Sequence, residues 1–145
     1  MTRDALSRFV DAQADSYDTA LAEIRAGQKR SHWMWFIFPQ LRGLGHSAMA
    51  QHYGIASLDE ARAYLAHPVL GARYLACVEA VDALGMNDPV AAFGTIDAMK
   101  LRSSLTLFET ARPSPLIDKV LRRFFRGIRD AATQQILSAS AKATN

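Results

Sequence analysis

The chain has 145 residues, of which 50% are hydrophobic and 21% charged, with a formal net charge of +3 and one cysteine. This length and composition fit a single globular domain and exclude a disordered or fibrous chain. A lone Cys77 excludes an internal disulfide, and the four histidines lack the spacing of metal ligands. We therefore expect neither a metal nor a cofactor.

The longest uninterrupted apolar run, from Trp33 to Pro39, is far shorter than the roughly 18 residues that a membrane span requires. The first residues, MTRDALSRF, mix acidic and basic side chains and lack the apolar stretch of a signal peptide. These features predict a cytoplasmic protein with no membrane partner.

Helix signals begin near the N-terminus. From Asp4 to Arg25 apolar residues recur every three or four positions, as on the buried face of a helix. Asp15 or Ser16 offers an N-cap that splits this stretch in two, and Gly27 ends it.

Proline, glycine and capping residues divide the rest of the chain. Ser57-Leu-Asp-Glu60 has the spacing of a capping box, with the Glu60 side chain returning to the Ser57 amide, and starts a helix to about Ala66. Further helices are predicted at 69–84, in a short turn closed by Gly94, at 95–111, at 115–126 and from Asp130 through Leu137. We expect one all-α domain of about seven to nine helices over residues 1–140, no significant sheet, and a frayed tail at 141–145.

The stretch KRSHWMWFIFPQ, from Lys29 to Gln40, is the most unusual part of the sequence. If Trp33 to Phe38 is helical, successive apolar side chains surround the axis, so protein must cover the helix on every side. Its rings then either form the hub of the core or contribute to a ligand site.

The residues around this stretch favour a ligand site. Lys29 and Arg30 would stand at a helix N-terminus, where the macrodipole disfavours positive charge. Together with the Ser31 hydroxyl and the free N–H groups of the first turn, they would bind an anion such as phosphate. In the alternative, both cations point into water and pair with Asp15, Asp18 or Glu23.

Two tryptophans offer a face on which a base or another ring would stack. The candidate ligand-binding residues are therefore Lys29, Arg30, Ser31, His32, Trp33, Trp35 and Gln40, with Ser104 from a second segment.

That second segment is IDAMKLRSSLTLFE, from Ile96 to Glu109. At about 100° per residue, Asp97, Lys100 and Ser104 form a polar stripe within the apolar arc of the helix. That arc comprises Ala98, Leu101, Leu105 and Phe108 on one side of the stripe and Ile96 and Leu107 on the other, while Arg102, Ser103 and Thr106 face solvent.

An Asp97–Lys100 pair buried in this arc is either structural or part of a functional site. Because both segments are buried and carry polar groups that need partners, we expect them to pack together. Lys100 should then lie near Trp33 or Trp35 in one pocket.

A basic and aromatic segment, LIDKVLRRFFRGIR, precedes the predicted last helix. Such a mixture can bind single-stranded nucleic acid. At helical spacing, however, its apolar residues form a core-facing arc and its arginines an outer face, near acidic neighbours such as Asp118 and Asp130. We therefore expect no nucleic-acid partner.

These blocks resemble a known family. KRSHWMWFIFPQ, the following GLGHS, SLDEARAYLAHPVLGARY, IDAMKLRSSLTLFE and FFRGIRDAAT are similar, over nearly the whole chain, to the bacterial family labelled domain of unknown function 1810. The resemblance implies an all-helical single domain and no particular reaction.

The layout is also similar to that of the NADAR superfamily, helical N-glycosidases that act on ADP-ribose conjugates and related ribosides. The shared features are a Trp-rich N-terminal helix, a central Lys-Leu helix around Lys100, and a Phe-Phe-x-Gly-x-x-Asp turn ending at Asp130. Ala131-Ala132-Thr133 stands where that superfamily has a Trp-Gly segment.

This similarity implies cleavage of an N-glycosidic bond in a phosphorylated ribose compound. Asp97 would stabilise positive charge on the sugar, with Lys100 as its companion. Two other hypotheses remain: a nucleotide-binding sensor without chemistry, and a protein-interaction module without a small-molecule ligand.

Overall fold

The computed structural model describes residues 5–143, and the side chains of residues 5–140. Ten helices lie in this part of the chain: α1 (Ser7–Ala14), α2 (Tyr17–Ala26), α3 (Met34–Ile37), α4 (Ala48–His52), α5 (Leu58–Ala66), α6 (Leu70–Asp82), α7 (Pro89–Phe93), α8 (Thr95–Ala111), α9 (Pro115–Phe125) and α10 (Ala131–Ala143). Within the described range, the extended backbone forms only an isolated parallel bridge, between Leu41 and Ile55. The predicted all-α single domain is therefore confirmed.

Local sequence signals account for most helix boundaries. Ser57 accepts a hydrogen bond from the Glu60 amide at 3.1 Å, while the Glu60 carboxylate accepts from the amide of Ala56 and not from that of Ser57. Gly27 ends α2 in the left-handed conformation, with φ at 70°. Asp88 caps α7 directly before its first-turn proline. Each of these boundaries lies where the sequence predicts it.

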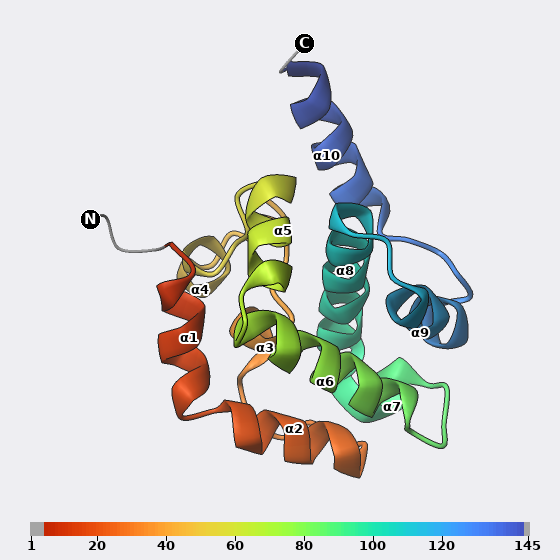
Figure 1. Cartoon of the computed structure of the whole chain (residues 1–145). Helices are drawn as coiled ribbons and strands as arrows, with labels where there is room; N and C mark the ends of the chain where they lie inside the picture. Colours follow the sequence, from red (N-terminus) through yellow and green to blue (C-terminus); the bar gives the residue numbers. More distant parts are fainter. Residues whose placement is uncertain (1–4, 144–145) are drawn as a thin grey trace.

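α8 is the hub of the fold. It contacts α3, α5, α7, α9 and α10, and in Figure 1 it stands between α5 and α9 with α10 beyond its C-terminal end. Phe108 of α8 stacks against Tyr74 of α6, with ring centroids 4.4 Å apart, and against Tyr64 of α5. The aromatic core therefore ties three helices together around α8.

Several predicted boundaries differ from the structure, most of them by one or two residues. The aromatic helix is shorter than predicted, because Trp33 is the residue before α3 and Phe38 the one after it. α10 continues past Leu137 to Ala143, through an alanine-rich stretch without a helix-breaking residue. Residues 141–143 of the predicted frayed tail thus belong to α10, whereas residues 144–145 and the predicted helix start at Asp4 lie outside the described residues.

The faces of α8 also differ from the prediction. Ser103 and Thr106 were expected to face solvent but are buried, and the chain between α9 and α10 contacts Thr106. The backbone amide of Asp130 donates to Thr106 Oγ1 at 3.0 Å. Ile96, expected in the apolar arc, is 70% exposed, and Met99 is 57% exposed. The first turns of α8 therefore present apolar side chains to solvent. No helix within residues 5–143 is both long and apolar enough to cross a bilayer.

Candidate functional site

The two segments singled out in the sequence meet in the structure. Lys29 Nζ lies 2.8 Å from Asp97 Oδ2 and 5.0 Å from the centre of the Trp33 ring. Lys100 Nζ lies 3.8 Å from Asp97 Oδ1 and 5.2 Å from the centre of the Trp35 ring. The predicted contact between Lys100 and a tryptophan is therefore present. We call these five residues the Lys-Asp-Lys cluster.

The cluster has an inner and an outer half. The Lys29 side chain is 7% exposed and Trp33 is buried, so neither offers a surface to a ligand. Lys29 Nζ also donates to the Ser31 carbonyl oxygen. The Asp97 and Lys100 side chains are 21% and 27% exposed, and Trp35 is half-buried. The Asp97–Lys100 pair is thus partly solvated, which corrects the expectation of a buried pair.

The charges of the cluster do not cancel. Two ammonium groups face one carboxylate, and the shorter contact belongs to Lys29. The distance of 3.8 Å between Lys100 Nζ and Asp97 Oδ1 is long for an ion pair. A partly exposed pair of this kind stabilises a fold by at most about 1 kcal/mol. Lys100 therefore remains available to another anion.

The anion site predicted at Ser31 exists, but a side chain of the protein fills it. Glu23 of α2 accepts three hydrogen bonds at Oε1, from the backbone amides of Arg30 and Ser31 at 2.7 and 2.9 Å and from the Trp33 indole at 2.9 Å. The Ser31 hydroxyl donates to Oε2 at 2.6 Å. Ser31 and Trp33 thus bind an internal carboxylate in place of a phosphate. Both residues precede α3, so the donors are not the first-turn amides of a helix that the sequence predicted.

This arrangement changes the acidity of Glu23. Burial alone would raise the pKa of its carboxyl, but the hydrogen bonds from Ser31, the Arg30 amide and the Trp33 indole outweigh burial and hold the pKa at about 2. Glu23 is therefore an ionised anchor between α2 and the aromatic segment at neutral pH. The sequence named it only as one of three alternative partners for the cations, and no spacing indicated that four donors would converge on it.

The remaining candidate residues divide between surface and core. Arg30 and His32 are exposed, and the Arg30 guanidinium donates to Gln28 at 3.0 Å. Gln40 and Trp35 line a hollow of about 10 Å³, enough for one water molecule and too small for a nucleotide. Ser104 is fully buried and shares a 3.0 Å hydrogen bond with the Tyr74 hydroxyl, so it belongs to the core.

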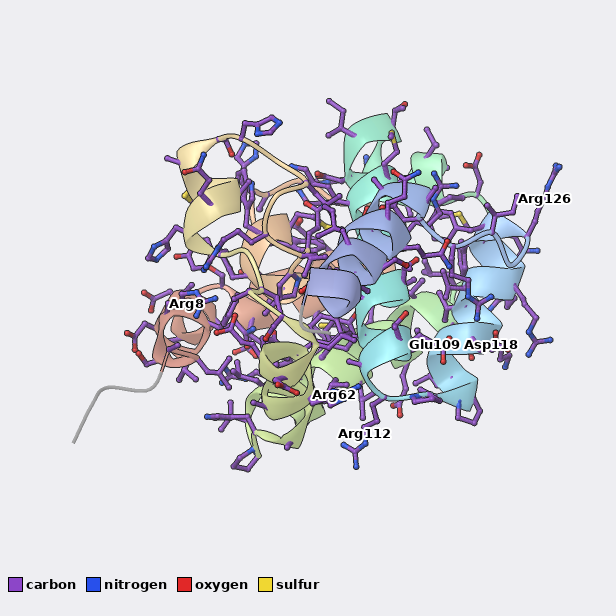
Figure 2. The ribbon with its side chains drawn as sticks, turned by 90° about the horizontal axis from the view of Figure 1, so that it is seen from above. Arg8, Arg62, Glu109, Arg112, Asp118 and Arg126 are labelled. Carbon is purple, nitrogen blue, oxygen red and sulfur yellow. The ribbon has the colours of Figure 1, made fainter. Side chains whose placement is uncertain are left out.

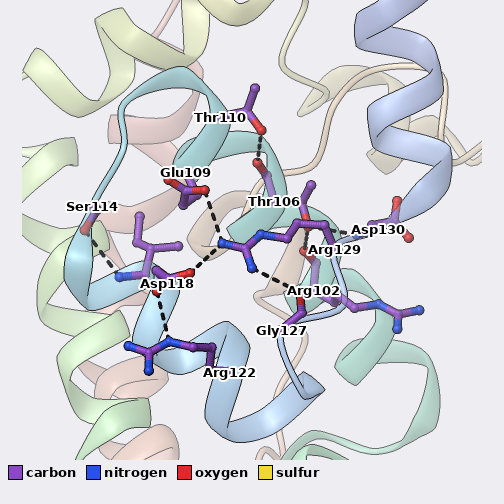
Figure 3. A network of polar contacts seen from close by, with 11 residues as sticks. Arg102, Thr106, Glu109, Thr110, Ser114, Asp118, Arg122, Gly127, Arg129 and Asp130 are labelled. Atoms are coloured by element: carbon purple, nitrogen blue, oxygen red, sulfur yellow. Dashed lines mark hydrogen bonds and ion pairs between the residues drawn. The ribbon is translucent and has the colours of Figure 1, made fainter.

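The arginines of the basic segment are largely engaged with acids and carbonyls. Arg129 contacts Asp118 at 2.6 Å and Glu109 at 3.3 Å, and Arg122 also contacts Asp118, as Figure 3 shows. These hydrogen bonds, that of Arg129 first, lower the pKa of the Asp118 carboxyl. Arg123 instead joins α9 to the end of α6 through the Asp82 carboxylate. Asp130, the other predicted neighbour, caps α10 by accepting from Thr133.

The described residues contain no group of three or more histidine, cysteine or acidic side chains placed to hold a metal ion. Cys77 is buried, and burial raises the pKa of its thiol to about 12. A thiol with so high a pKa is a poor nucleophile, so we assign Cys77 to the core.

Fold and site together define an all-α protein whose central helix carries a partly exposed lysine against a tryptophan. Over residues 3–137 the chain matches the model of the family described as "Protein of unknown function (DUF1810)", and it belongs to that family. It is similar to the crystal structure of the conserved hypothetical protein Rv1873 from Mycobacterium tuberculosis, with 46% identity and a TM-score of 0.90. The match covers 92% of this chain and 96% of that one. No curated protein matches the chain.

Proposed function

We propose that the outer half of the Lys-Asp-Lys cluster binds a small phosphorylated molecule with a ring, of the nucleotide or ADP-ribose type. The observation that carries this proposal is the position of Lys100. Its ammonium lies over a half-exposed tryptophan and has only a loose contact with a carboxylate already paired to Lys29. A phosphate would compete well for this ammonium, and a ring would stack on the exposed part of Trp35.

The binding surface of this proposal is smaller than the sequence suggested. Trp35 and Lys100 form it, Gln40 borders it beside Trp35, and the exposed side chains of Arg30 and His32 lie on the same aromatic segment. Lys29 and Trp33 support it from within, whereas Ser31 binds Glu23 and Ser104 belongs to the core. The ligand would therefore lie on a shallow surface and keep much of its own area in water, which favours a sensor over a tight binder.

Asp97 is the residue of this surface that could take part in a reaction, and the resemblance of the sequence layout to the NADAR N-glycosidases suggests which reaction. A carboxylate at this position would stabilise the positive charge that develops on a ribose as its N-glycosidic bond breaks. Lys100 would then hold the phosphate of the same substrate. Hydrolysis of the ligand is the more specific proposal, whereas ligand binding alone is the function that the geometry supports best.

Thermal unfolding with and without ligand tests the proposal. ADP-ribose and ribose 5-phosphate should raise the Tm in a concentration-dependent way, since a ligand that binds only the folded state stabilises it. Plain ribose should leave the Tm unchanged. Lys100→Ala should abolish the shift, whereas Lys119→Ala, which removes the same charge from an exposed position on α9, should retain it.

The same samples separate binding from catalysis. Asp97→Asn should keep the thermal shift and lose any release of the base from an N-ribosyl substrate, because a catalytic carboxylate acts mainly in the transition state. A Tm that no phosphorylated nucleoside or sugar changes would refute both the sensor and the glycosidase.

One observation favours a second candidate, an interaction module. Ile96 and Met99 are exposed on the first turns of α8, close to Lys100 in the sequence. Neighbouring exposed apolar side chains can mark a surface that binds another protein. Replacing both with serine should then weaken retention of a partner on immobilised protein while leaving the far-UV circular dichroism unchanged. Equal retention by the variant and the wild type would count against this candidate.

We also propose that nucleic acid is not a partner. The net charge is only +3, and the arginines of α9 that contact Asp118 and Asp82 are already neutralised locally. Fluorescence anisotropy with single-stranded RNA and DNA should show weak binding at physiological salt. A tight association that falls steeply with added salt would contradict this proposal.

A further inference from the structure

A cleft of about 280 Å³ lies on another part of the molecule, where α5 and α6 meet the start of α9. Leu65, Leu75 and Ile117 line it with apolar side chains, and the turn of residues 112–115 forms its edge. Its size is near the lower end of the range for small-molecule sites, and its lining is mostly apolar with one charged residue, as such sites usually are. None of its lining residues belongs to the Lys-Asp-Lys cluster.

The edge of the cleft is held in one shape. Pro113 and Pro115 restrict the backbone on both sides of Ser114. Ser114 caps α9, since its hydroxyl accepts from the Ile117 amide at 3.3 Å and its carbonyl from the Asp118 amide at 3.0 Å. A turn fixed in this way loses little conformational entropy when a ligand binds.

The charged residue of the cleft is unpaired. Among the described residues, the Arg112 guanidinium has no hydrogen bond and no ion pair, and its side chain is exposed. Two acids near this turn, Glu109 at the end of α8 and Asp118 on α9, are both engaged by Arg129. Arg112 is therefore a cation without a counter-charge at the edge of an apolar cleft.

A second arginine, paired with an acid, lies beside this edge. Arg62 of α5 donates from Nε to the carbonyl oxygen of Ala111 at 2.8 Å, which places it beside Arg112, and it also reaches Asp59 at 3.3 Å. Figure 2 shows Arg62 and Arg112 at the same edge of the molecule. The N-terminus of the eleven-residue helix α9, with its partial positive charge, lies at the same cleft.

We propose that this cleft binds a small apolar monocarboxylate. The hydrocarbon part would cover Leu65, Leu75 and Ile117, of which Leu75 is 38% exposed without a ligand. The carboxylate would accept two parallel hydrogen bonds from Arg112, because the planar guanidinium matches the spacing of two carboxylate oxygens. A single free arginine suits a single negative charge better than a phosphate dianion.

Titration of the ¹⁵N-labelled chain with octanoate at pH 7 tests this inference. Saturable amide shifts are expected at Leu65, Leu75, Ser114 and Ile117, and the cluster around Lys100 should not respond. Octan-1-ol has the same hydrocarbon chain without the charge, and it should bind at least tenfold more weakly. Because the readout is specific to each site, the result is independent of the function proposed for Lys100.

Three variants complete the experiment. Arg112→Gln should weaken octanoate binding at least tenfold. Arg126→Gln should leave the affinity unchanged, because it removes an exposed arginine at the other end of α9 that likewise has no ion pair among the described residues. Leu75→Glu should abolish binding by placing a like charge in the cleft. The inference is overturned if octanoate shifts no residue of the cleft, if the alcohol binds equally well, or if Arg112→Gln binds like the wild type.

Discussion

Glu23 offers the sharpest test of how the aromatic segment is held in place. Substitution by glutamine keeps the size and shape of the side chain but removes the charge on which four hydrogen bonds converge. The amide also brings an NH₂ group towards the Ser31 hydroxyl and leaves the three donors at Oε1 with a weaker acceptor. We therefore expect a stable but clearly weakened fold.

The pKa of Glu23 sets the size of the effect. A fall from the ordinary value of 4.5 to about 2 corresponds to about 3 kcal/mol of preference for the charged form. Because the carboxylate is partly exposed, solvent screening reduces the contribution to the free energy of unfolding to about 1–2 kcal/mol. Glu23→Gln should lower that free energy by this amount at pH 7.

Urea denaturation followed by tryptophan fluorescence measures the change, since the Trp33 indole is itself one of the donors. Glu79→Gln on α6 is the matched control, because this glutamate is exposed and its side chain has no hydrogen bond or ion pair among the described residues. The control should alter the free energy of unfolding by less than about 0.5 kcal/mol.

The dependence on pH provides a second readout. Since folding lowers the pKa of Glu23, its contribution is complete above the unfolded value near 4.5 and is lost as the pH falls from there towards 2. The gap between wild type and variant should therefore be constant from pH 7 to about pH 5 and should narrow below pH 4.5. A gap that stays the same down to pH 3, or no gap at pH 7, would refute the assignment of Glu23 as a charged anchor.

Three further predictions concern the core. Gly71→Ala should lower the free energy of unfolding by about 2–4 kcal/mol in the same urea assay, because the new Cβ would overlap a carbonyl oxygen of α5. Gly85→Ala is the control: its new Cβ would meet no described atom within 4 Å beyond the adjacent residues, so the free energy should change by less than about 0.5 kcal/mol. Ser104→Ala should cost about 1–3 kcal/mol by leaving the buried Tyr74 hydroxyl without its partner, and a cost near zero would show that water replaces the serine. Cys77 should react with a thiol reagent at pH 8 only in denaturant, because burial raises its pKa to about 12, and rapid labelling of the native protein would show that α6 opens.

Much of the helix pattern could be predicted because it depends on local chemistry. Proline cannot continue a helix, glycine readily adopts the left-handed conformation that ends one, and serine or aspartate caps satisfy the free amides of a first turn. The limits of α8 and the start of α9 follow from such residues, whereas Ser16 precedes α2 without a side-chain cap. The contact of Lys100 with Trp35 was also predictable, because two apolar segments that carry polar groups must provide partners for them.

The composition of the site was not predictable in the same way. Ser31 and Trp33 bind Glu23, which lies on another helix, and no local rule specifies which distant carboxylate reaches a set of free donors. The identity of the anion depends on how α2 packs against the aromatic segment. The same holds for Lys29, whose partner Asp97 is more than sixty residues away.

The sequence by itself determined where most helices begin and end, because proline, glycine and capping residues act on their immediate neighbours. Only the tertiary structure decided which side chains are accessible to solvent, because a side chain is buried by helices and loops that are distant in the sequence. On α8 the chain leading into α10 covers Thr106, while nothing in the described structure covers Ile96 and Met99. Periodicity fixes the angle at which a side chain leaves its helix, whereas the packing of neighbouring helices decides whether it meets protein or water.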